Sequence, residues 1–243
     1  MSVAGNRSVI TPRDLEWLEW MGRWRFVTGP MIAREFSARG QSAPPTSVDR
    51  RLRVFIERGL VGYERVLADT PRLLWLTRAG MRLAELDGPV VTPKFADIRH
   101  DLKVIDVAHW LSTTRVPSHT LVTEREIRRR EGGLRPGESG TYSLRVTGWK
   151  RNRAYPDLVS VNPSGRAWGH EVELSRKNHD RLVHLMRAYY DAPAFAGAVY
   201  YVADHLRRYV EAAAKQVNEA AMQDGADGHV INVEPLPSIG GQA

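Results

Sequence analysis

Three acidic residues, Asp157, Glu171 and Glu173, fall within one short stretch of the chain. Two apolar-rich runs, at 158–161 and 168–174, flank an Asn-Pro-Ser-Gly sequence, and this pattern predicts a β-hairpin. Side chains alternate along a strand, so Glu171 and Glu173 should point to the same face. If the strands pair through the turn, Asp157 joins them at one end of the sheet. Three carboxylates placed together repel one another unless a cation lies between them.

Such a carboxylate group would suit Mg²⁺ or Mn²⁺, because these hard cations prefer oxygen ligands. The alternative is a solvated strand face, on which Glu171 and Glu173 pair with basic side chains close by in the sequence. Arg166, Arg176 and Lys177 are the candidates for that pairing. Charged faces are common in half-exposed sheets. The hairpin by itself leaves both interpretations open.

The composition fits a packed protein of one or two domains. The chain has 243 residues, 42% of them hydrophobic, and it has no cysteine, which excludes disulfides and thiolate metal sites. No apolar run approaches the roughly 20 residues of a membrane span. The first residues contain no apolar segment of the secretory type. We therefore expect a cytoplasmic protein without a membrane partner.

The charge balance is strongly basic, at +7, and 30 of the 35 basic residues are arginines. Arginine presents a planar set of donors that matches phosphate oxygens, so this composition favours a nucleic-acid backbone as partner. The alternative is that the arginine content only reflects the base composition of the genome. The sequence does not decide between the two.

Residues 11–88 carry the pattern of three helices, two short strands and a closing helix. Thr11, Ser47 and Thr77 are predicted N-caps, because their hydroxyls can accept hydrogen bonds from first-turn amides. Gly59 is predicted to end the third helix. We expect the six elements at about 12–24, 28–36, 48–58, 60–66, 72–76 and 78–86.

This order resembles the winged-helix members of the helix-turn-helix class over residues 11–88. The resemblance implies that the third helix enters the major groove of double-stranded DNA. Arg50 and Arg53 lie one turn apart on its predicted outer face, with Arg51 beside them, and Arg72 lies at the wing. These arginines could reach phosphates or guanine edges. A solvated face, or a module for protein contacts, is the alternative.

After a linker with two prolines at 88–93, the C-terminal region has the predicted order α-β-β-β-α-β-α-β. We expect its elements at about 96–113, 120–123, 158–161, 168–174, 178–190, 197–202, 205–222 and 230–233. Between the first strand of this order and the acidic hairpin, residues 132–152 form a predicted mobile basic loop. Lys150, Arg151 and Arg153 at its end are further candidates for DNA contact.

The C-terminal order resembles the core of PD-(D/E)xK nucleases, with Pro156-Asp157 as the first element and Glu171-Val172-Glu173 as the second. Together with the N-terminal module, the chain resembles the replication-relaxation family of bacterial plasmids and other mobile elements. The expected fold is therefore α+β, with a winged helix-turn-helix domain at 11–88 and a mixed α/β PD-(D/E)xK nuclease-like domain at 95–235. The resemblance implies a role in replication, relaxation or transfer of DNA, without requiring catalysis.

One departure from the nuclease pattern concerns the lysine, since Glu173 stands where the pattern has it. That lysine normally positions water and offsets charge on the phosphate. Lys177, four residues later, is the stronger substitute, and Lys150 is the weaker one. In the mechanism that the resemblance implies, Asp157 and Glu171 bind Mg²⁺ or Mn²⁺ for phosphodiester hydrolysis, and the Val172 carbonyl completes the shell. Glu173 then acts as third ligand or base.

Two residues of the helix before the sheet, His100 and Asp101, would join this site only if that helix packs against the acidic end. Otherwise a capping or core role fits His100 equally well. Three functions remain open: a metal-dependent nickase or endonuclease, a DNA-binding accessory protein or transcriptional regulator with an inactive scaffold, and a ligand-responsive repressor. Salt bridges that bury the carboxylates would favour the last. The sequence leaves the oligomeric state open, with a homodimer as one option.

Overall fold

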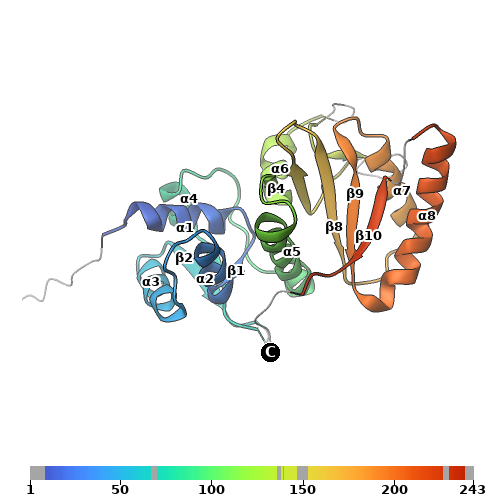
Figure 1. The fold of residues 1–243 in the computed structure, drawn as a ribbon. Coiled ribbons are helices and arrows are strands. Elements are labelled where there is room, and N and C mark those ends of the chain that lie inside the picture. The colour runs from blue at the N-terminus through green and yellow to red at the C-terminus, as the bar shows by residue number, and fades with distance from the viewer. Residues whose placement is uncertain are drawn as a thin grey trace, which may run out of the picture. The chain divides into compact units, whose positions relative to one another are not determined.

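The computed structural model describes residues 9–66, 70–135, 138, 140–146, 153–226 and 230–238. The chain has an α+β fold that divides into two compact units, Met1–Ile98 and Arg99–Ala243 (Figure 1). Within the described ranges, no helix is both long enough and apolar enough to cross a membrane.

The N-terminal unit packs its helices around a small antiparallel sheet with strand order β1-β3-β2. The helices are α1 (Pro12–Gly22), α2 (Gly29–Ala38), α3 (Pro45–Glu57) and α4 (Arg78–Leu83). The strands are β1 (Val27–Thr28), β2 (Val61–Glu64) and β3 (Leu73–Leu76). The predicted order of three helices, two strands and a closing helix is confirmed.

Two details of this unit differ from the sequence prediction. The third helix begins at Pro45 rather than after Ser47, because a proline at the first helical position already has the required φ. The short strand β1, which pairs with β3, was not predicted, since two residues show no alternation. By contrast, Thr11 and Thr77 do cap α1 and α4.

A buried polar contact fixes α3 against α1 in this unit. Asp14 closes the capping box of α1 with Thr11 and also binds the guanidinium of Arg51. Burial would raise the pKa of Asp14, but the hydrogen bonds from Arg51 and Thr11 outweigh it and lower the pKa. The aromatic core lies next to this contact, with the Trp17 and Phe36 rings 5.4 Å apart.

The C-terminal unit is built on a mixed five-stranded sheet with strand order β10-β9-β8-β7-β4. The pairs β4–β7 and β7–β8 are antiparallel, whereas β8, β9 and β10 run parallel. The strands are β4 (Thr120–Thr123), β7 (Leu158–Val161), β8 (Ala167–Glu173), β9 (Phe195–Val202) and β10 (Ile231–Pro235). The helices are α5 (Ile98–Trp110), α6 (Glu124–Glu131), α7 (His179–Tyr190) and α8 (Arg207–Gln223). Short helical turns lie at Phe95–Asp97, Leu111–Arg115 and Asp204–Leu206.

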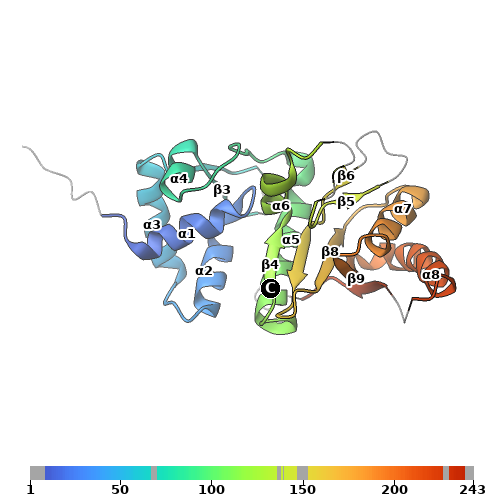
Figure 2. The ribbon, with the colours of Figure 1, turned by 90° about the horizontal axis from the view of Figure 1, so that it is seen from above.

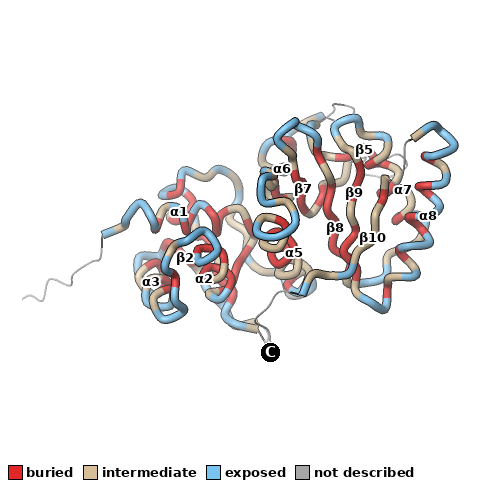
Figure 3. The backbone as a smooth tube through the Cα atoms, viewed as in Figure 1, coloured by how far each residue is buried: buried red, intermediate tan, exposed pale blue. Residues whose placement is uncertain are grey.

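Helices cover both faces of this sheet. Tyr200 and Tyr201 are neighbours on β9 and so point to opposite faces. The Tyr201 ring contacts Trp110 of α5 and the Tyr200 ring contacts Tyr189 of α7, which places these helices on opposite sides (Figure 2). As a result β8 and β9 are buried over most of their length (Figure 3).

The predicted order of the C-terminal elements is confirmed, with two additions. The charged stretch after β4 forms α6, whose capping box joins Thr123 and Glu126. The two-residue strand β5 (Leu144–Arg145) lies within the stretch expected to be a loop and pairs with β6 (Arg153–Ala154), which follows that stretch. The first turn of α6 bears on the site, because the amide of Glu124 donates to the backbone carbonyl of Asp157 at 3.1 Å.

Candidate functional site

The predicted hairpin of β7 and β8 is present, and its register sets the position of the first acidic residue. Leu158 pairs with His170, so Asp157 stands at the end of β7 beside the last residues of β8. Its Oδ2 accepts a hydrogen bond from the amide of Val172 at 2.9 Å. One oxygen of Asp157 is therefore held by the backbone of the neighbouring strand.

Glu171 and Glu173 are buried on the α7 face of β8, with 5% and 3% of their surface exposed. The hydroxyl of Tyr189 donates to Glu171 Oε1 at 2.5 Å, and Lys177 forms an ion pair with Glu173. The interpretation that Glu171 and Glu173 lie on a solvated strand face is therefore wrong, because both side chains are buried. The ion pair that it predicted with Lys177 does exist, at Glu173.

The close approach of Tyr189 depends on a glycine in β8. A Cβ atom at Gly169 would lie 2.1 Å from the Tyr189 ring, so a larger residue would push the ring away. Because Gly169 has no side chain, the ring can approach β8 closely, and its hydroxyl reaches the carboxylate of Glu171.

The three carboxylates influence one another electrostatically, which shows that the structure brings them together. Burial and the negative charge of Asp157 raise the pKa of Glu171 well above its usual value. Burial also raises the pKa of Glu173, and there Lys177 opposes the shift. Protons on these two groups are therefore held more tightly than in water.

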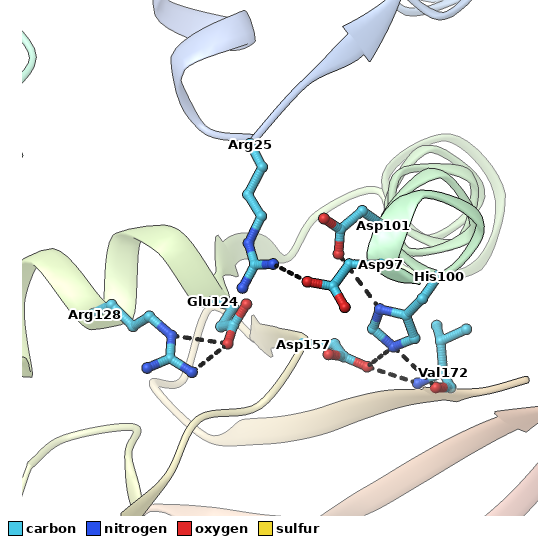
Figure 4. A network of polar contacts seen from close by, with 8 residues as sticks. All are labelled: Arg25, Asp97, His100, Asp101, Glu124, Arg128, Asp157 and Val172. Atoms are coloured by element: carbon cyan, nitrogen blue, oxygen red, sulfur yellow. Dashed lines mark hydrogen bonds and ion pairs between the residues drawn. The ribbon is translucent and has the colours of Figure 1, made fainter. Parts of the chain in front are cut away.

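Asp157 behaves in the opposite way because of a histidine on α5. Burial would raise the pKa of Asp157, but the hydrogen bond and positive charge of His100 lower it. His100 Nε2 lies 3.2 Å from Asp157 Oδ2 and 3.1 Å from the Val172 carbonyl, and Nδ1 lies 3.5 Å from Asp101 Oδ1 (Figure 4). Burial opposes the charged ring, yet the bonds to Asp101 and Asp157 raise the pKa of His100 to about 11. The helix before the sheet thus does place His100 at the acidic end.

Lys177 supplies the second positive charge. Burial lowers the pKa of its ammonium, but the charges of Glu173 and Glu171 outweigh it and raise the pKa. The backbone of Lys177 is fixed as well, since the Tyr209 hydroxyl donates to its carbonyl at 2.7 Å. Two cationic side chains, His100 and Lys177, therefore face three carboxylates.

Tyr200 on β9 lies next to this group of side chains and is not among the site residues predicted from the sequence. It pairs in register with Glu171 and is fully buried. Its hydroxyl has no hydrogen-bond partner in the part of the chain that the structure describes. Burial and the charges of Glu171, Glu173 and Asp157 raise the pKa of this phenol. Only the strand order β9-β8 could have revealed it, and a hairpin pattern does not contain that information.

The carboxylate oxygens at this end of the sheet are of the type that a hard cation binds, but the described side chains are not arranged as a complete set of metal ligands. Among the described residues, no three or more acidic or histidine side chains are arranged to hold an ion. The ligands predicted for Mg²⁺ or Mn²⁺, Asp157 and Glu171, are engaged by His100 and Tyr189.

Of the arginines predicted to contact DNA in the N-terminal unit, some are exposed to solvent and one is not. Arg50 and Arg53 are exposed on α3, whereas Arg51 turns inward to Asp14. Arg72 is exposed before β3, and its guanidinium lies 5.5 Å from the centroid of the Tyr63 ring. The structure thus offers Arg50, Arg53 and Arg72 to solvent.

In the C-terminal unit, the basic stretch before the hairpin is described only in part. Arg153 donates to Ser143 Oγ at 2.6 Å and to the Glu138 carbonyl at 2.7 Å, so its guanidinium holds the local backbone. The other two residues predicted there, Lys150 and Arg151, lie outside the described residues.

No protein-family model, curated protein or solved structure matches the chain. The functional argument therefore depends on the residues and their geometry.

The raised pKa of Glu171 predicts how the free energy of unfolding depends on pH. A carboxyl whose pKa rises on folding contributes stability below its unfolded pKa of about 4.3 and loses it as the pH rises toward the folded pKa. Glu171→Gln stays neutral, so its stability relative to the wild type should increase with pH above about 4.3. Thermal unfolding from pH 4 to 8 measures this difference. The exposed Glu219→Gln is the control, and a Glu171→Gln effect that is constant with pH would contradict the assignment.

Proposed function

We propose that this protein binds double-stranded DNA and cleaves a phosphodiester bond with the help of Mg²⁺ or Mn²⁺ at the end of β7 and β8. The observation that carries the proposal is a group of three carboxylates at one end of the sheet, of which Glu171 and Glu173 are buried and Asp157 is partly buried. Buried carboxylates cost stability unless they are compensated, so a cluster of them indicates a functional site.

The order of elements around the cluster supports a nuclease-like core. Helix α5, the antiparallel strands β4, β7 and β8, helix α7 and the parallel strand β9 follow one another as in the PD-(D/E)xK pattern. Asp157 directly precedes the first hairpin strand, and Glu171 and Glu173 lie at the end of the second, which supports this interpretation.

The donor set at the cluster fits a hard divalent cation. Carboxylate oxygens of Asp157 and Glu171 and the Val172 carbonyl are the ligand types that Mg²⁺ and Mn²⁺ prefer. The buried Tyr200 hydroxyl, which lacks a partner among the described residues, could bind a water held there. The ion, when bound, would activate water and polarise the phosphate.

Lys177 takes the role that the missing lysine of the pattern would have. Its ammonium lies at Glu173 and acts electrostatically on Glu171 and Asp157, so it faces the place where a phosphate would gain negative charge. Glu173 orients this ammonium, and Tyr189 holds the carboxylate of Glu171 in place.

The N-terminal unit supports DNA binding by its shape and charge. Its three helices followed by an antiparallel hairpin resemble a winged helix, in which the third helix reads the major groove. Arg50 and Arg53 are exposed on that helix, and Arg72 is exposed at the hairpin. The net charge of +7 favours a phosphate backbone as the partner.

A non-enzymatic DNA-binding accessory protein or regulator is the second candidate function. The specific observation in its favour is that His100 and Lys177 already neutralise two of the carboxylates by ion pairs. Such pairs would also be found in a ligand-responsive repressor whose acidic residues have a structural role. The two experiments below separate these functions.

The first experiment concerns the exposed arginines of α3. Replacing Arg50 and Arg53 by Ala should weaken DNA binding. The slope of the logarithm of the binding constant against the logarithm of the salt concentration should fall by about one for each lost phosphate contact. Both are exposed, so the melting temperature should stay close to that of the wild type. Arg82→Ala, also exposed in this unit, is the matched control. Unchanged affinity and salt dependence in the double variant would exclude α3 from the DNA interface.

The second experiment concerns Asp157. Mn²⁺ should raise the melting temperature of the wild type, because an ion at a hundredfold above its Kd stabilises the folded state by about 2.7 kcal/mol. Asp157→Asn should lose this rise and all nicking of supercoiled plasmid, yet retain DNA binding. The exposed Asp180→Asn is the control. A wild type that neither responds to metal nor cleaves plasmid would leave the accessory or regulatory function.

A further inference from the structure

A single nitrogen atom of His100 contacts two oxygen atoms from different strands. Nε2 lies 3.2 Å from Asp157 Oδ2, at the end of β7, and 3.1 Å from the carbonyl oxygen of Val172, on β8. An N–H at this position donates to both oxygens at once. One carboxylate oxygen and one carbonyl oxygen thus point at a common position, and the imidazole ring occupies it.

The two oxygens that His100 contacts are also ligands of the type that a divalent ion requires. Mg²⁺ binds carboxylate and carbonyl oxygens, at about 2.0–2.1 Å. The lone pairs that now accept the imidazole N–H would then point to the ion. The ring and an ion cannot share these lone pairs, because the N–H already occupies the space in front of both oxygens.

We propose that His100 occupies the cation position between Asp157 and Val172, and that a divalent ion binds there only when this side chain turns away. The inference rests on the proposed function in one respect, namely that Asp157 is a metal ligand. It adds that His100 competes with the ion and so sets the metal affinity of the site.

The surroundings of His100 allow such a movement. About a third of its side chain, 34%, is exposed, so solvent lies on one side of the ring. The ring is held by contacts to Asp157, Val172 and Asp101, the last at 3.5 Å.

The test is a titration of Mn²⁺ into the full-length wild type, His100→Ala and His100→Gln, followed by calorimetry. His100→Ala should bind Mn²⁺ at least about tenfold more tightly than the wild type, as expected for the loss of a competing interaction. His100→Gln keeps a hydrogen-bond donor on a more flexible side chain and should fall between the two. His184→Ala removes an exposed histidine of α7 and controls for metal bound by surface imidazoles.

A second measurement reports directly on the ring. The ¹H–¹⁵N signals of the His100 imidazole should shift from a hydrogen-bonded to a solvent-exposed position when Mg²⁺ is added, and they should not shift in Asp157→Asn. Melting temperatures without metal show whether each variant is folded, and His100→Gln remains informative if His100→Ala unfolds.

Each outcome separates this inference from the proposed cleavage. Equal affinity in the wild type and both His100 variants overturns the competition, while plasmid nicking that depends on Asp157 would keep the proposed function. Weaker binding in the variants also overturns it, because His100 would then be a ligand. Tighter binding without any nicking supports the competition and removes the nuclease. Failure of all variants to bind Mn²⁺ overturns both.

Discussion

The compensation of buried negative charge at the end of β7 and β8 is the constraint on which the C-terminal unit depends. A carboxylate that loses water without a partner costs several kcal/mol, and three of them lie together here. The protein meets this cost with His100, with Lys177 and with the Tyr189 hydroxyl. Each of these groups comes from a different element, so the site requires the whole arrangement of helices around the sheet.

Several local features hold these groups in place. The first turn of α6 binds the backbone of Asp157, Gly169 admits the Tyr189 ring, and the Tyr209 hydroxyl of α8 fixes the backbone of Lys177. None of these contacts involves the carboxylates of the acidic residues or the ammonium of Lys177. The packing of the sheet and the chemistry of its acidic end are therefore coupled, and a change in packing at Gly169 would reach Glu171.

The order of elements could be predicted from the sequence because turns, caps and periodicity are local. The hairpin at Asp157, the cap at Thr11 and the exposure of Arg50 follow from such patterns. The contributions of His100 and Tyr200 could not be predicted, since they depend on which face α5 covers and which strand lies next to β8. The inward turn of Arg51 likewise depends on α1, which is distant in sequence.

The central claim is that the acidic end of the sheet is a cation site at present filled by protein side chains. The most direct test is anomalous diffraction from crystals of the protein grown with Mn²⁺. The account predicts an anomalous peak bound by Asp157 and Glu171, with the His100 ring turned away from the Val172 carbonyl. Crystals that show no peak at these carboxylates, with His100 still bonded to Asp157, would contradict it.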